Sequence, residues 1–265
     1  MEIEINKKKQ KKHGNRFFFF ILTILCVVVC VFISQFLSSV ITTGAIGITN
    51  NTTTSYSEYK LYALSLASYS TESQANDYAN TITRQGAGGY VWQKGNKYYV
   101  IASIYEKKND AESVLKNLTE NASAEIVEIK IDKVSLSQIS NSNLKKEYLS
   151  IMSNLKETYC KLYDISVSLD TSVYSETKSR IEIDNVKTNL QNQLDKISNG
   201  SSSADGIYYV IIKNSVQKII DKIGDVVEYT STDNFPFSAK LKHTYISIVE
   251  DISDLVDILN DENNW

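Results

Sequence analysis

The chain contains few of the residue types that build disulfide scaffolds, metal sites and histidine-based catalytic sites. Its 265 residues include three cysteines, two histidines and one proline. Cys26 and Cys30 lie in an apolar segment, which leaves Cys160 as a small half-buried residue or as one half of an intermolecular disulfide. His13 precedes that segment and His243 stands alone in a helical pattern, so no histidine pair is available for a metal or a base.

Nothing else in the sequence indicates a catalytic site. Gly86-Ala87-Gly88-Gly89 lies between a helix and a strand with no Lys-Thr after it, so it predicts a turn and not a phosphate loop. The carboxylates of the last helical pattern fit a solvated face better than a glycosidase pair; they are Glu250, Asp251, Asp254, Asp257, Asp261 and Glu262. We therefore expect a protein that is not an enzyme and uses no cofactor or metal, with a wall hydrolase as the rival class.

A basic tail followed by a long apolar run predicts a membrane anchor. Residues 1–16 carry six basic and two acidic residues, and the 25 residues from 17 to 41 carry no charge. This run exceeds the roughly 20 residues that cross a bilayer, and the basic flank predicts a cytoplasmic N-terminus. A cleaved signal peptide is the alternative, although its apolar core is only about 7–15 residues long. Residues 42–59 are rich in Thr, Asn, Ser and Gly, so we expect a flexible linker to a part outside the membrane.

The part beyond the basic tail is acidic. The tail holds six of the 28 basic and two of the 31 acidic residues, so the rest has a formal net charge of −7. A negative surface argues against nucleic-acid partners and against attraction of anionic polymers. Any carbohydrate ligand would have to be held by stacking and hydrogen bonding.

Residues 60–131 contain one strand–helix–strand unit twice. Tyr62, Tyr69 and Ala75 recur 36 residues later as Tyr98, Tyr105 and Ala111. Both copies carry an i, i+3, i+4, i+7 apolar stripe, which predicts an amphipathic helix in each. The stripes are Ala75, Tyr78, Ala79 and Ile82, then Ala111, Val114, Leu115 and Leu118.

Strands are predicted on both sides of each helix, over residues 61–66, 90–94, 98–104 and 125–131. Gly95-Asn96 joins the second and third strands as a hairpin. Capping-box spacing at Thr71–Gln74 and at Asn109–Glu112 predicts the two helix starts. The resulting βαββαβ order predicts a ferredoxin-like α+β domain, in which both helices cover one face of a four-stranded antiparallel sheet and the other face is open.

The duplicated unit resembles the sporulation-related repeat, or SPOR, domain of bacterial cell-envelope proteins. That family repeats a strand of aromatic, x, Val, x, Val, Gly, Ser, Phe, followed by a helix with Ala six residues after the last aromatic residue. The segments here are YALSLASY at 62–69 with Ala75, and YYVIASIY at 98–105 with Ala111. The resemblance implies a domain over 60–132 that binds peptidoglycan glycan strands stripped of their peptides, as found at division septa.

The chain departs from the family pattern at two kinds of position. The family's Gly is Ala67 in the first copy and Ser103 in the second, which are small residues tolerated at a bend. The Gln that the family often carries in the middle of the first strand is Ser65, and this change bears on ligand binding more than on the fold.

Strand alternation predicts which residues form a glycan platform. Leu64, Leu66, Val100 and Ala102 continue the family's apolar positions under the helices, so their neighbours face outward. The predicted glycan-binding residues combine rings that stack on sugars with hydroxyls that bond to them; they are Ser65, Ser68, Trp92, Tyr99, Ile101 and Ser103. The strand at residues 90–94 has two possible registers. In one, Trp92 joins this face; in the other, Tyr90 and Trp92 face the core. Alternatively, the same residues pack against the C-terminal helices, which would bury this sheet face and leave no ligand site.

Residues 133–265 are helical in pattern. Apolar stripes over about 144–169, 173–197, 207–227 and 236–259 predict four helices, with a break at 199–203 and Pro236 in the first turn of the last one. Four such helices close an antiparallel bundle, and the polar second helix is a candidate surface for a homo-dimer. The predicted function is a single-pass membrane protein that binds peptidoglycan and helps organise division or sporulation proteins. The alternative is an interaction adaptor with a degenerate SPOR-like domain, whose C-terminal helices contact the partner.

Overall fold

The computed structural model describes residues 56–118, 123–199, 203–232 and 235–261. The basic tail, the transmembrane helix and most of the linker lie outside these ranges and stay predictions. Within the ranges, no helix combines the length and the apolar character that a membrane span requires. Tyr56 belongs to the predicted linker, yet its side chain is buried and its ring lies edge-on to that of Tyr59. The folded part of the chain therefore begins within the predicted linker.

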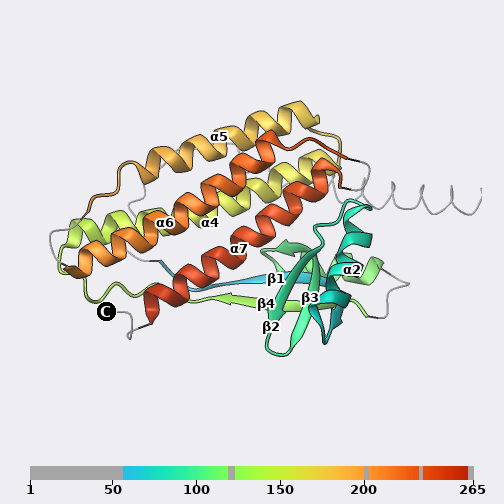
Figure 1. Ribbon diagram of the computed structural model, residues 1–265, viewed down its shortest axis with the longest axis horizontal. Coiled ribbons are helices and arrows are strands. Elements are labelled where there is room, and N and C mark those ends of the chain that lie inside the picture. Colours follow the sequence, from blue (N-terminus) through green and yellow to red (C-terminus); the bar gives the residue numbers. More distant parts are fainter. Residues whose placement is uncertain (1–55, 119–122, 200–202, 233–234, 262–265) are drawn as a thin grey trace, which may run out of the picture. The chain divides into compact units, whose positions relative to one another are not determined.

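A four-stranded antiparallel sheet forms the N-terminal half of the described chain, in the order β2-β3-β1-β4. The strands are β1 (Tyr59–Tyr69), β2 (Tyr90–Lys94), β3 (Lys97–Tyr105) and β4 (Glu125–Ile131). Gly95 adopts a φ of +62° in the turn between β2 and β3, which confirms the predicted hairpin. The predicted βαββαβ order is also confirmed (Figure 1).

Helices α2 (Glu72–Thr83) and α3 (Lys108–Asn117) follow β1 and β3. Thr71 is the N-cap of α2 as predicted, but its hydroxyl donates to the side-chain oxygen of Gln74 at 3.0 Å and caps no backbone group. The capping box predicted at Asn109 is wrong, because the N-cap of α3 is Lys107, two residues earlier. Ala75 and Ala79 of α2 are buried against Val100 of β3, and small side chains let the helix lie close to the sheet.

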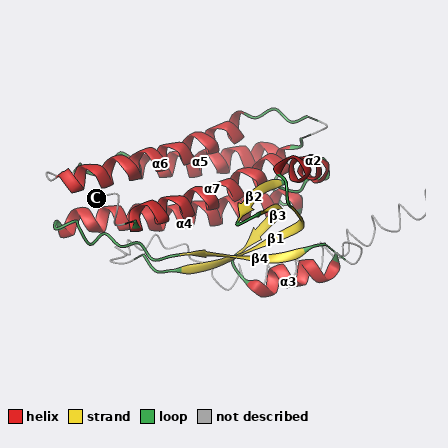
Figure 2. Ribbon diagram, turned by 60° about the horizontal axis from the view of Figure 1, so that its bottom comes forward, coloured by secondary structure: helices red, strands yellow, loops and turns green. Residues whose placement is uncertain are grey.

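Four helices follow the sheet, as predicted. They are α4 (Ser142–Asp170), α5 (Glu176–Leu194), α6 (Ser203–Glu228) and α7 (Phe237–Asn260). Asn141 caps α4 by accepting from the amides of Asn143 and Leu144, and Ser175 caps α5. Pro236 is the N-cap of α7, whereas the sequence predicted it within the first turn of that helix. Figure 2 shows α4 and α7 next to the sheet, α5 and α6 farther away, and α3 on the opposite side of β1 and β4.

The sheet face opposite α3 is covered by the helical region. One continuous apolar cluster joins Leu61, Ala63 and Ile101 of the sheet to Tyr159 of α4 and to Ile246 of α7. The expectation that this face is open is therefore corrected. The physical reason lies in α7, which is apolar on several sides; a helix of that kind must be buried on all of them, and the sheet supplies one of the covering surfaces.

Candidate functional site

Two cross-strand rows make up the face on which the sequence predicted a ligand platform. The tip row consists of Trp92, Tyr99 and Ser68, which lie opposite one another on β2, β3 and β1. The covered row, one step farther from the hairpin turn, consists of Tyr90, Ile101 and Ser65. Residues opposite one another in antiparallel strands project to the same side, so each row is a continuous strip of side chains.

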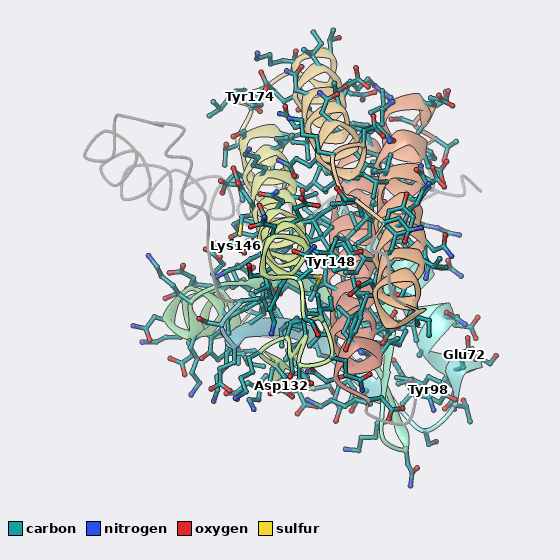
Figure 3. The ribbon with its side chains drawn as sticks, turned by 90° about the vertical axis from the view of Figure 1, so that its left-hand side faces the viewer. Glu72, Tyr98, Asp132, Lys146, Tyr148 and Tyr174 are labelled. Atoms are coloured by element: carbon teal, nitrogen blue, oxygen red, sulfur yellow. The ribbon has the colours of Figure 1, made fainter. Side chains whose placement is uncertain are left out.

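Strand pairing fixes the side of the sheet to which these rows belong. Tyr90, Trp92 and Tyr99 pack against the cluster shared with α4 and α7. The intervening Val91 and Val100 pack against the cluster around α2. Of the two registers that the sequence allowed, the structure thus has the one in which Trp92 shares a face with Tyr99. Figure 3 shows Tyr98, the neighbour of Tyr99, near Glu72 of α2 and away from Tyr148 of the bundle.

Two of the three residues of the covered row, Ser65 and Ile101, have no surface for a ligand. Ser65 is 0% exposed and Ile101 is 1% exposed. The Ser65 hydroxyl donates to the carbonyl of Ala67 at 2.8 Å, within a stretch where the β1–β3 register shifts twice. This hydrogen bond spans a bulge, so the hydroxyl satisfies the local backbone at the position where the family often carries Gln.

Ser103 is also engaged by the bundle. Its hydroxyl lies 2.8 Å from the hydroxyl of Tyr245, a fully buried residue of α7. Burial raises the pKa of the Tyr245 phenol, and burial raises the pKa of nearby Tyr105 to about 12, so both rings stay neutral. Of the six predicted site residues, the structure places Ser65, Ile101 and Ser103 beneath or against the helices, whereas Trp92, Tyr99 and Ser68 are half-buried.

Polar contacts from one flank of α7 hold the start of β2. The Tyr90 hydroxyl donates to Glu250, and the Tyr90 ring lies edge-on to His243 with 5.0 Å between ring centroids. His243 Nδ1 lies 3.1 Å from the carbonyl oxygen of Gly88. Burial lowers the pKa of His243 and raises the pKa of Glu250, since each group loses solvation of its charged form. The pair Tyr90–Glu250 therefore marks the border between the covered row and solvent.

The glycine-rich segment before β2 is a turn shaped by this contact. A Cβ at Gly88 would lie 2.5 Å from Ile246 Cδ1 and 3.0 Å from the carbonyl oxygen of Ala102. Gly89 has a φ of +55°, and a Cβ there would lie 2.4 Å from Thr83 Cγ2. The glycines thus let the chain pass between α7, β3 and α2, as fits the predicted turn.

Sequence reasoning did not find the α7 residues that cover the face, namely Tyr245, Ile246 and Glu250. Two signals pointed to them. Tyr99 and Ile101 make the predicted open side of β3 apolar. The apolar positions of α7 also extend beyond a single stripe.

Comparison with known proteins gives one match. The profile of the SPOR domain family matches residues 58–128, which span the strands and helices from β1 into β4. No curated protein and no solved structure matches the chain. SPOR domains are non-catalytic binding domains that generally bind peptidoglycan, in proteins of the cell envelope and of division. The duplicated strand pattern, the βαββαβ fold and the profile match agree, and residues 58–128 are a SPOR domain.

Proposed function

We propose that the protein is a non-enzymatic, membrane-anchored envelope protein that binds peptidoglycan glycan strands through the tip row and helps organise division or sporulation. The observation that carries the proposal is the coincidence of a SPOR domain with a half-buried row of two aromatic rings and a hydroxyl. Sugar rings stack their C–H faces on aromatic side chains, and their hydroxyls pair with groups such as that of Ser68.

The proposed contact surface is smaller than the platform expected from the sequence. Trp92 and Tyr99 lie directly opposite each other, so their rings form a neighbouring pair along the hairpin. Ser65 and Ile101 support this pair from beneath α7 and do not contact the ligand. Lys94 and Lys97 lie opposite each other at the next positions on the same side, nearer the turn, and both are exposed.

Binding to wall sacculi stripped of peptides by an amidase tests this proposal. The full chain should sediment with stripped sacculi, and the double variant Trp92→Ala, Tyr99→Ala should not. Tyr98→Ala is the matched control, since Tyr98 is the adjacent half-buried tyrosine on the opposite, α2-facing side. Loss of binding in both variants would mean that the fold, not a site, was disturbed; retention in both would refute the tip row as the contact.

The proposed topology places residues 1–16 in the cytoplasm, residues 17–41 in the membrane and the remainder outside, with SPOR and bundle segments at 60–132 and 133–265. The uncharged run and its basic flank support it. Protease added to cells without their wall should remove the mass after residue 42, and full protection would reverse the topology.

A second candidate function is an interaction adaptor whose SPOR domain no longer binds glycan. The covered row favours it, because α7 occupies part of the sheet face with the chain's own side chains. In this case the wild-type chain would not sediment with stripped sacculi, and it would be recovered instead with another envelope protein.

A further inference from the structure

The end of the β2–β3 hairpin carries two lysines that face each other. Lys94 and Lys97 flank the turn at Gly95, and both are exposed. Like charges directly opposite each other on antiparallel strands destabilise the pairing. The two lysines lie on the same side of the sheet as Trp92 and Tyr99, about 7 Å farther along the strands, since neighbouring positions on one side are separated by two residues. We call Lys94 and Lys97 the hairpin lysines.

A second pair of opposed lysines in the same sheet shows how the chain relieves such repulsion. Lys60 of β1 lies opposite Lys130 of β4. Lys60 pairs with Glu128 at 2.7 Å, and Lys130 pairs with Asp132 at 2.6 Å and with Glu58 at 3.5 Å. Each of these two ammonium groups is therefore balanced by a carboxylate of the chain itself.

The hairpin lysines lack such a carboxylate. Among the described residues, no acidic side chain forms an ion pair with Lys94 or Lys97. Lys94 Nζ donates to the backbone carbonyl oxygen of Glu128 at 2.7 Å, which is a neutral acceptor and leaves the charge uncompensated. The Glu128 carboxylate is engaged by Lys60, whose hydrogen bond holds the pKa of Glu128 below its ordinary value; the charges of Lys108 and Lys94 contribute less.

Positive charge is therefore in surplus at the end of the hairpin. Glu72 of α2 lies near Tyr98 in Figure 3, but Tyr98 packs toward α2, on the other side of the sheet from the hairpin lysines. The chain beyond the basic tail has a negative net charge, so this surplus is local. An anionic ligand would supply the partners that the fold does not, in charge-assisted hydrogen bonds.

Glycan stripped of its peptides carries a suitable anion. In peptidoglycan each peptide is joined by an amide bond to the lactyl carboxyl group of a muramic acid sugar. Hydrolysis of that bond by an amidase leaves a free carboxylate on the sugar, whereas a sugar that still bears its peptide has a neutral amide there. A sugar stacked on the tip row would hold such a group near the hairpin lysines, whose flexible four-carbon stems extend their reach.

We propose that Lys94 and Lys97 bind the lactyl carboxylates of stripped glycan and thereby select it over glycan that bears peptides. The inference rests on the proposed function, since it requires glycan on the tip row. It adds a contribution to binding that weakens as salt is raised, because the charges involved are exposed.

Sedimentation of the full-length chain with graded amounts of amidase-stripped sacculi tests the role of the lysines. The double variant Lys94→Gln, Lys97→Gln should bind roughly tenfold more weakly than the wild type, with an unchanged melting temperature. Lys60→Gln, Lys130→Gln is the matched control, because it removes the same charge from the other opposed pair. This control should bind stripped sacculi as the wild type does.

Neutralising the ligand tests the same contact without changing the protein. Carbodiimide coupling with methylamine converts the carboxylates of stripped sacculi into neutral amides. The wild type should bind amidated sacculi as weakly as the hairpin-lysine variant binds untreated ones, and the treatment should not weaken binding of that variant further. Sacculi that retain their peptides, which have carboxylates of their own, should bind the wild type weakly.

The outcomes separate this inference from the proposed function. A wild-type chain that does not sediment with stripped sacculi would overturn both. Wild-type binding that survives the hairpin substitutions or the amidation would overturn the inference alone. An equal loss in the Lys60, Lys130 control would do so too, because net charge and not the hairpin would then govern binding. Lysine-dependent binding that is as strong to sacculi with peptides would assign the anion to the peptides or to another wall polymer, and would also overturn the inference.

Discussion

The hydroxyl of Tyr245 lies 2.8 Å from the hydroxyl of Ser103, and this contact joins the middle of α7 to a central strand of the SPOR domain. Around it, the Tyr245 ring is edge-on to Tyr159 and Tyr163 of α4, at centroid distances of 6.0 and 5.9 Å. The family's Gly position in the second copy is Ser103 here, so a departure from the family pattern supplies the polar group that the bundle helix uses.

Tyr245→Phe should destabilise the fold by about 0.5–1.5 kcal/mol, because the half-buried Ser103 hydroxyl loses this hydrogen-bond partner. Ser103→Ala should cost a similar amount, and the double variant should cost less than the sum. Denaturant unfolding of the four proteins measures the coupling. Additive effects would mean that the two hydroxyls do not stabilise each other.

Gly88→Ala should destabilise the fold by about 1–3 kcal/mol, because the new methyl group would overlap Ile246 Cδ1 at 2.5 Å. Ile246→Val removes that carbon, so the pair of changes should cost less than Gly88→Ala and Ile246→Val added together. Gly224→Ala is the matched control, since its Cβ would meet only Lys187 at 3.7 Å and should stabilise α6 by about 0.5–1 kcal/mol. Equal losses at both glycines would contradict the packing argument.

Local patterns predicted most of the SPOR domain. The bounds of β2 and β4 match the predicted segments, and alternation placed Leu66 and Val100 on the α2 side. Alternation was less informative near Ser65, because the β1–β3 register shifts twice there and a bulge changes which side the next residue faces. No sequence pattern marked those bulges in advance.

Contacts between distant elements were harder to predict. The four bundle helices follow from their stripes, but a stripe shows only that a side is buried and does not name its partner. The contacts of α7 with Gly88, Tyr90 and Ser103 join residues about 140–160 positions apart. Half of the predicted platform is therefore covered by a helix whose docking no local pattern encodes.

Stability should fall with pH below about 6.5 partly because of His243. Burial holds the pKa of His243 below its ordinary value of 6.5, so the unfolded chain takes up a proton that the folded chain resists. When the unfolded state binds more protons, stability rises with pH; the His243 contribution is complete above 6.5 and is lost as pH falls toward the lowered pKa.

The difference in stability between wild type and His243→Gln isolates this effect. Burial raises the pKa of Glu250 and of Asp254, so these groups favour the folded state as pH falls, but they are present in both proteins and largely cancel. The wild-type curve should drop relative to the variant by at most about 1.4 kcal/mol per pH unit below 6.5. Parallel curves would show that His243 titrates alike in both states.

The sheet and the bundle should unfold together, since one apolar cluster contains Leu61 and Ile101 of the sheet with Tyr159 and Ile252 of the bundle. The chain has two tryptophans, so Trp265→Phe leaves Trp92 as a fluorescent reporter in the tip row. Circular dichroism near 222 nm would be dominated by the long bundle helices. The two probes should give coincident urea transitions, because unfolding of α7 exposes the apolar sheet face that it covers. Two separate midpoints would instead mean that residues 60–132 and 133–265 fold independently, and that the covered row can be exposed without unfolding the SPOR domain.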